Sequence, residues 1–83
     1  MHSTYLYADV TFEKDGATSF GVVQNSTGNV TQLLNEIYEI YQEPDVNNLS
    51  IVKAWSEESN KKESCDITWK ITEMLNKKID EEI

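Results

Sequence analysis

A six-residue pattern that occurs twice constrains the fold more than any other feature of the chain. VTQLLN at residues 30–35 returns in conservative form as ITEMLN at residues 71–76. Each copy begins a segment with helical periodicity, and each follows two runs with the alternation of strands. The chain of 83 residues is therefore predicted to form a single domain, 1–83, of α+β class: two layers, a four-stranded antiparallel sheet and two helices on one face (β-β-α-β-β-α).

The first half of the chain begins with a predicted hairpin. In residues 4–13 apolar side chains alternate with polar ones, the period of a half-buried strand. The second strand is expected to turn one set of side chains inward: Thr18, Phe20, Val22 and Gln24. A three-residue loop, Lys14-Asp15-Gly16, would pair Val10 with Phe20 and bring the apolar faces together. A two-residue Asp15-Gly16 loop would turn Phe20 outward, so we expect the longer loop.

A helix is predicted to begin near Val30, with Asn29 as its N-cap. Its apolar residues share one face, the pattern of a helix packed on a core: Val30, Leu33, Leu34, Ile37 and Tyr41. Pro44 is expected to end this segment, because the residue before a proline avoids helical geometry.

The second half is predicted to repeat this order. Leu49, Ile51 and Trp55 mark a third strand. Strict alternation over residues 64–71 predicts a fourth, and pairing Trp55 with Cys65 would set Ile51 opposite Trp69. The alternative is one helix over residues 64–82, which would place Trp69 away from the other apolar residues. We favour the strand, followed by a helix over residues 72–82 that buries Met74, Leu75 and Ile79.

The charge of the chain limits its function. Fifteen acidic residues face seven lysines, there is no arginine, and −6 of the net −8 lies in residues 1–52. Direct nucleic-acid binding is not expected, because it requires cations that replace phosphate counterions. No apolar run approaches the roughly 18 residues of a membrane span. One cysteine, Cys65, and a start without the pattern of a secretory signal lead us to expect a cytoplasmic protein.

Groups that carry catalysis are scarce. The single histidine, His2, lies at a terminus, and Cys65 falls on the apolar side of a predicted strand, where a thiol is usually an inert hydrophobe. Neither a Cys-His pair nor a Ser-His-acid triad can be assembled. The glycines are scattered and provide no phosphate-binding loop, and the Cys/His spacing of a metal site is missing. We therefore expect no enzyme, no cofactor and no metal.

One candidate binding surface is an acidic stripe on the first predicted helix. Glu36, Glu39 and Glu43 are spaced by three and four residues on its solvent side, and Asp45 follows. A solvated helix face would also explain the pattern. However, no lysine lies at helical spacing to relieve the repulsion between these carboxylates. The stripe can therefore be interpreted as a surface for a basic partner.

A second candidate surface lies on the outer side of the first predicted strand. Tyr5 and Tyr7 stand beside Asp9 there, a combination typical of an ordinary sheet surface and also of protein-binding patches. The helices would leave this side of the sheet uncovered. Val23, with Val52 or Ala54, is expected to add apolar area.

These features predict a non-enzymatic acidic binding protein, an inhibitor or adaptor that occupies the basic, nucleic-acid-binding site of a partner. The partner would be a basic protein such as a nuclease or DNA-binding protein, and the chain itself a monomer or homodimer. In size, charge and lack of catalytic groups the chain resembles the small acidic inhibitors that phages use against host nucleases, including anti-CRISPR proteins. The alternative is a structural or regulatory homo-oligomeric subunit whose acidity only maintains solubility.

Overall fold

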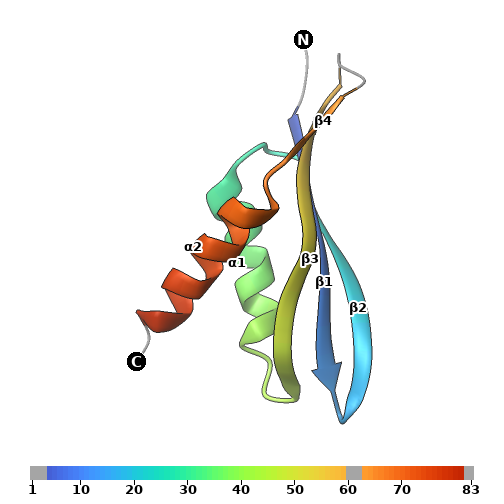
Figure 1. The fold of residues 1–83 in the computed structure, drawn as a ribbon, viewed down its shortest axis with the longest axis vertical. Coiled ribbons are helices and arrows are strands. Elements are labelled where there is room, and N and C mark those ends of the chain that lie inside the picture. The colour runs from blue at the N-terminus through green and yellow to red at the C-terminus, as the bar shows by residue number, and fades with distance from the viewer. Residues whose placement is uncertain (1–3, 60–62, 82–83) are drawn as a thin grey trace.

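The computed structural model describes residues 4–59 and 63–81. Along this part of the chain the elements are β1 (Thr4–Lys14), β2 (Ala17–Asn25), α1 (Val30–Tyr41), β3 (Val46–Glu58), β4 (Ser64–Asp66) and α2 (Thr68–Asp80). All strand pairs are antiparallel, and the sheet order is β2-β1-β3-β4. Both helices lie on one face of the sheet (Figure 1). The predicted α+β class and the order β-β-α-β-β-α are confirmed.

The core lies between the sheet and the two helices. Its buried apolar side chains come from the inward positions of the two central strands and from one face of each helix: Leu6, Ala8, Val10, Leu33, Leu34, Ile37, Tyr38, Ala54, Ile71 and Leu75. This burial is what stabilises both helices, because segments of this length are marginal in isolation. Neither described helix is long and apolar enough to cross a membrane.

Helix α1 begins where the sequence predicts. The side-chain oxygen of Asn29 accepts hydrogen bonds from the backbone N–H groups of Thr31 at 2.9 Å and Gln32 at 3.3 Å. It thereby pairs two of the donors that the first turn of a helix leaves unsatisfied. The helix ends at Tyr41, before Pro44, as expected. In the second copy of the repeat the correspondence is looser, since Ile71 lies one turn inside α2.

The predicted three-residue loop of the first hairpin is wrong. Lys14 pairs directly with Ala17, so the loop is Asp15-Gly16, with φ values of 53° and 80°. Positive φ at both central positions is what a type I′ turn requires, and its twist matches that of the strands it joins. This local preference outweighs the hydrophobic pattern and shifts the register by one residue, so Phe20 and Val22 point outward.

Strand β3 is longer than predicted and contains a bulge. Ile51 pairs with Val10 whereas Lys53 pairs with Asp9, which leaves Val52 without a partner of its own. The extra residue changes which side chains face the core. Ile51 packs against the core, whereas Trp55 lies opposite Tyr7 on the other side of the sheet.

The predicted fourth strand is confirmed only over residues 64–66, and the alternative of one helix over residues 64–82 is wrong. Strand β4 stops at Asp66 and α2 begins at Thr68. Cys65 pairs with Ser56 rather than with Trp55, and Trp69 is helical and 72% exposed. In the helix, Ile71 and Leu75 lie one turn apart and both reach the core. Met74 and Ile79 are only partly buried, and the expected end of the helix lies outside the described residues.

The change from strand to helix at this point is caused by hydrogen bonds of Thr68, one set local and one to β3. The backbone N–H of Thr68 donates to Oδ1 of Asp66 at 2.8 Å, and the Thr68 hydroxyl approaches the same oxygen at 2.6 Å. The backbone N–H of Ala54 donates to the Thr68 hydroxyl oxygen at 2.9 Å. These bonds satisfy a donor of the first turn and tie the start of α2 to β3, so the strand cannot continue.

Candidate functional site

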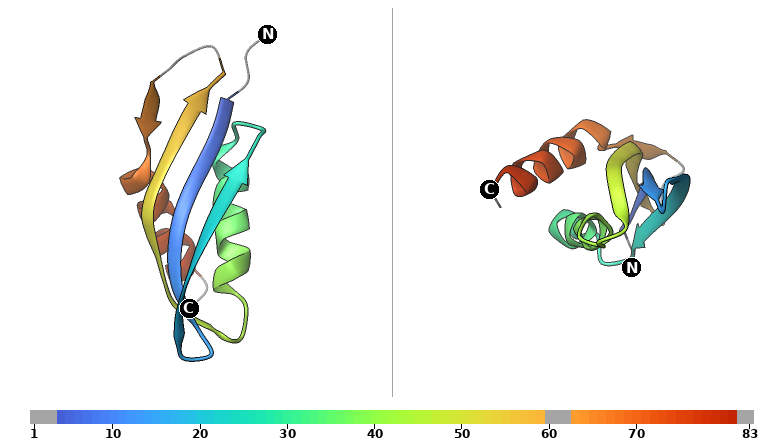
Figure 2. Two further views of the ribbon diagram at one scale, coloured as in Figure 1. Left: turned by 90° about the vertical axis from the view of Figure 1, so that its right-hand side faces the viewer. Right: turned by 90° about the horizontal axis from the view of Figure 1, so that it is seen from below.

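Within residues 4–59 and 63–81, no helix covers the face of the sheet opposite α1 and α2 (Figure 2). The registers of β1 with its two neighbours place a mixed set of aromatic, apolar and charged residues on it. We call this set the outer face: Tyr5, Tyr7, Asp9, Thr11, Glu13, Phe20, Val22, Lys53, Trp55 and Glu57. The exposed bulge residue Val52 directly precedes Lys53 of this set in the sequence.

An ordered aromatic cluster occupies one end of the outer face. The rings of Tyr7 and Trp55 stack, with centroids 5.3 Å apart and planes inclined by 17°. Nζ of Lys53 lies 5.3 Å from the centroid of the Trp55 ring. The indole N–H of Trp55 donates to Oε1 of Glu57 at 3.2 Å. A ring held by a stack, a cation and a hydrogen bond loses little freedom when a partner contacts it.

The other end of the outer face is apolar and exposed. Phe20 is 79% and Val22 69% accessible, and Val52, on β3, is 60% accessible. Of the residues expected to add apolar area, Val52 is exposed, whereas Val23 is partly buried against the core and Ala54 is fully buried. Phe20, Val22 and Trp55 were missed because the sequence pattern assigned them to the inner face. The Asp15-Gly16 pair, a strong signal for a two-residue turn, would have exposed the first two.

The residues of the predicted acidic stripe do not form a uniform surface. Glu39 is exposed, but Glu36 is half-buried, and its Oε2 is inaccessible to solvent with no hydrogen-bond partner among the described residues. Nζ of Lys14 lies 3.6 Å from Oε2 of Glu43 and 3.8 Å from Oδ2 of Asp45. The hairpin therefore supplies the compensating cation that the helix itself lacks.

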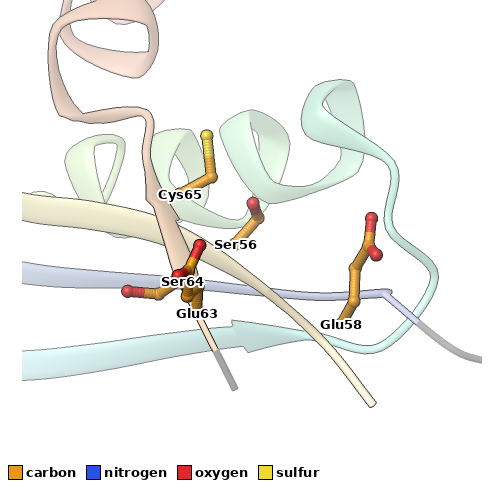
Figure 3. Close-up of a pocket in the computed structure, with 5 residues that line it drawn as sticks. All are labelled: Ser56, Glu58, Glu63, Ser64 and Cys65. Atoms are coloured by element: carbon orange, nitrogen blue, oxygen red, sulfur yellow. The ribbon is translucent and has the colours of Figure 1, made fainter. Parts of the chain in front are cut away.

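The end of the β3–β4 hairpin forms a shallow pocket of about 180 Å³ (Figure 3), lined by Ser56, Glu58, Glu63, Ser64 and Cys65. The Cys65 thiol is exposed, which corrects its predicted place in the core. The reason is the register: Cys65 extends from a three-residue edge strand. His2, the other candidate nucleophile or base, lies outside the described residues.

Asp66 lies next to this pocket, and its carboxylate has a displaced pKa. The hydroxyl and the backbone N–H of Thr68 both donate to its carboxylate, which lowers the pKa of Asp66 below its ordinary value. This arrangement serves to start α2. Within residues 4–59 and 63–81, no three His, Cys, Asp or Glu side chains converge as metal ligands would.

Comparisons of the chain with protein-family models, with curated proteins and with solved structures found no match. The function must therefore be argued from the surfaces themselves.

Proposed function

We propose that the protein is a non-enzymatic acidic binding protein that occupies a basic, nucleic-acid-binding site of a partner protein. The observation that carries the proposal is the composition of the outer face. There, exposed apolar side chains and an ordered tryptophan lie among the carboxylates of Asp9, Glu13 and Glu57. Aromatic anchors provide most of the affinity in protein interfaces, while charges direct the approach and orientation of the partner.

The partner class follows from charge. A net charge of −8 on 83 residues creates a negative field that accelerates encounter with a basic protein and slows encounter with an acidic one. A groove that binds nucleic acid already displays cations spaced for phosphates, and carboxylates can take the place of those phosphates. A nuclease or DNA-binding protein fits this description. The proposal thus assigns the chain to the type of phage inhibitors that includes anti-CRISPR proteins.

The outer face is favoured over the acidic stripe by what each presents to a partner. Glu43, the last residue of the stripe, and Asp45, which follows it, already have Lys14 as an ion partner. A partner cation would have to displace it. Asp9 has Lys53 as its cross-strand neighbour, but that lysine lies over the Trp55 ring. The outer face also offers apolar area, which the stripe does not.

The proposal includes a cytoplasmic setting, which a single exposed thiol suits, because exposed free cysteines persist in reducing compartments. It requires neither a catalytic group nor a cofactor.

Two matched triple variants test the function and the surface together. The first is Asp9→Asn, Glu13→Gln and Glu57→Gln on the outer face. The second is Glu36→Gln, Glu39→Gln and Glu43→Gln on the helix. Each removes three negative charges and keeps side-chain size, so any difference between them reports where the charges lie. Immobilised wild-type and variant proteins would be exposed to a bacterial extract at about 0.1 M and 1 M salt, where the screening lengths are about 10 Å and 3 Å.

Wild-type protein should retain a basic nucleic-acid-binding protein at low salt and release most of it at high salt. The purified partner should lose nucleic-acid binding when the wild-type protein is added in equimolar amount. The outer-face variant should associate more slowly than the helix variant. Retention that is indifferent to salt, or a partner that still binds nucleic acid in the complex, would refute the proposed function. An equal loss of partner binding in both variants would refute the outer face as the binding surface.

A further inference from the structure

The two edges of the sheet are built differently. On the β3 side the edge carries the bulge at Val52, a positive φ of 56° at Asn48 and the cation of Lys53, and a three-residue β4 covers part of it. Bulges, lysines and short strands are the devices by which proteins prevent edge-to-edge pairing. Strand β2 forms the opposite edge (Figure 2), and its register with β1 continues without a shift from Ala17 to Asn25.

Strand β2 also lacks charge and proline. Residues 16–35 contain neither an acidic nor a basic side chain, in a chain of which 27% is charged. The strand lies wholly inside this interval. Contact between the acidic parts of two copies would bring like charges together, because each chain has a net charge of −8. The neutral edge is where self-association meets the least repulsion.

The geometry of the hairpin determines which backbone groups β2 presents. In an antiparallel pair closed by a two-residue loop, Lys14 and Ala17 exchange hydrogen bonds, and such pairs alternate along the strands with pairs that do not. The backbone N–H and C=O groups of four residues therefore point away from β1: Thr18, Phe20, Val22 and Gln24. In the described chain none of these groups forms a backbone hydrogen bond outside the sheet.

We propose that the protein forms a homodimer by antiparallel pairing of β2 with β2 of a second copy, about a twofold axis at Gly21. In this register Phe20 lies opposite Val22 of the other copy on each side of the axis. Thr18 lies opposite Gln24 in the same way. Eight strands then form one continuous sheet, with the helices of both copies on the same face.

The register is self-complementary for three reasons. It pairs all four outward-pointing residues, whereas an axis at Phe20 or Val22 would leave part of the edge unmatched. It sets an aromatic ring beside a β-branched side chain twice, a favourable cross-strand combination. Finally, Gly21 meets its own copy at a position without exchanged hydrogen bonds, where the backbones approach most closely and the missing Cβ leaves room.

The first test measures mass by light scattering or sedimentation over a range of concentrations. Wild-type protein should reach twice its 9.5 kDa. The pair Phe20→Lys and Val22→Lys should raise the dimer dissociation constant by about tenfold or more, since lysines would then face each other across the axis. The control is Val52→Lys, which places a cation at an exposed valine on β3 and should leave the dimer intact. Circular dichroism would establish that each variant is folded.

The second test determines the register in which the two β2 strands pair. Gly21→Cys, in a Cys65→Ser background, should form an intermolecular disulfide under mild oxidation, because residues paired without exchanged hydrogen bonds have Cα atoms about 4.5 Å apart. A Cβ at Gly21 would meet its nearest neighbours at 3.5 Å and 3.6 Å, which is ordinary contact. Ser19→Cys is the matched control. It would face Val23 of the other copy and should not cross-link.

The dependence on salt concentration distinguishes dimerisation from partner binding. Screening should weaken the proposed contact with a basic protein but strengthen a dimer of two acidic chains. A wild-type protein that stays monomeric at high concentration and high salt would overturn the proposal. So would a dimer that Val52→Lys disrupts, or cross-linking at Ser19→Cys in place of Gly21→Cys. If the wild-type protein forms the dimer but binds no basic partner, the proposed function is refuted and the proposed dimer is not.

Discussion

Tyr7 and Trp55 stack across β1 and β3 because the bulge at Val52 turns the tryptophan to the outer side of the sheet. Without the extra residue the alternation that puts Ile51 on the core would put Trp55 there as well. One irregular residue thus builds the aromatic part of the proposed interface.

The two tryptophans should respond differently to removal. Trp55→Ala is expected to lower the free energy of unfolding by about 2 kcal/mol, because it removes a half-buried ring and a stacked pair. Trp69→Ala, at a largely exposed helical position, should change it by less than about 0.5 kcal/mol. Urea unfolding measures both. A larger cost at Trp69 would contradict the helical start of α2 at Thr68.

The hairpin turn can be tested at its glycine. Gly16→Ala should cost about 1–2 kcal/mol, since the residue has a φ of 80° and a side chain disfavours that conformation. Nothing lies within 4 Å of the new Cβ, so the cost is purely conformational. Gly28→Ala should cost more, because its φ is 73° and its Cβ would also meet Cβ of Thr4 at 3.1 Å. Thermal or urea unfolding checks this order, and a neutral Gly16→Ala would refute the turn.

Acid should weaken the protein partly through Asp66. Hydrogen bonds from Thr68 lower the pKa of this carboxyl in the folded state, so its stabilising contribution is present above the ordinary value of 3.8. It is lost as the pH falls below that value and through the folded-state pKa. Asp66→Asn keeps an acceptor for Thr68 but cannot titrate. The difference in unfolding free energy between wild-type and variant should therefore shrink toward low pH, and a constant difference from pH 7 to pH 2 would contradict this account.

Cys65 should be reactive and dispensable for stability. Because the thiol is exposed, Cys65→Ala leaves no buried cavity, and the free energy of unfolding should change by less than about 0.5 kcal/mol. In the folded protein a thiol reagent should titrate one group as fast as it does in urea. Slow reaction of the thiol in the folded protein, or a loss of several kcal/mol in the free energy of unfolding of Cys65→Ala, would indicate that Cys65 is buried in the core.

Local patterns were sufficient for much of the fold. The cap at Asn29, the apolar face that contains Leu33 and Ile37, and the repeated β-β-α unit all follow from neighbours in sequence. So does the overall acidity. These features are encoded within a few residues, where capping and periodicity act directly.

The apolar pattern alone did not decide which side of the sheet each strand residue faces, and for Trp55 only the tertiary structure decided it. Phe20 faces solvent because a turn two residues long outweighs the burial of one apolar face, and Trp55 does so because β1 accommodates a bulge in β3. Thr68 begins a helix because its hydroxyl contacts Ala54, fourteen residues earlier. A strand has a period of two, so one inserted or omitted residue exchanges its faces, and the apolar pattern alone cannot report that residue. The Asp15-Gly16 turn encodes the exposure of Phe20 and Val22 locally, but the aromatic part of the candidate site at Trp55 was decided only in the assembled sheet, where β1 pairs with the bulged β3.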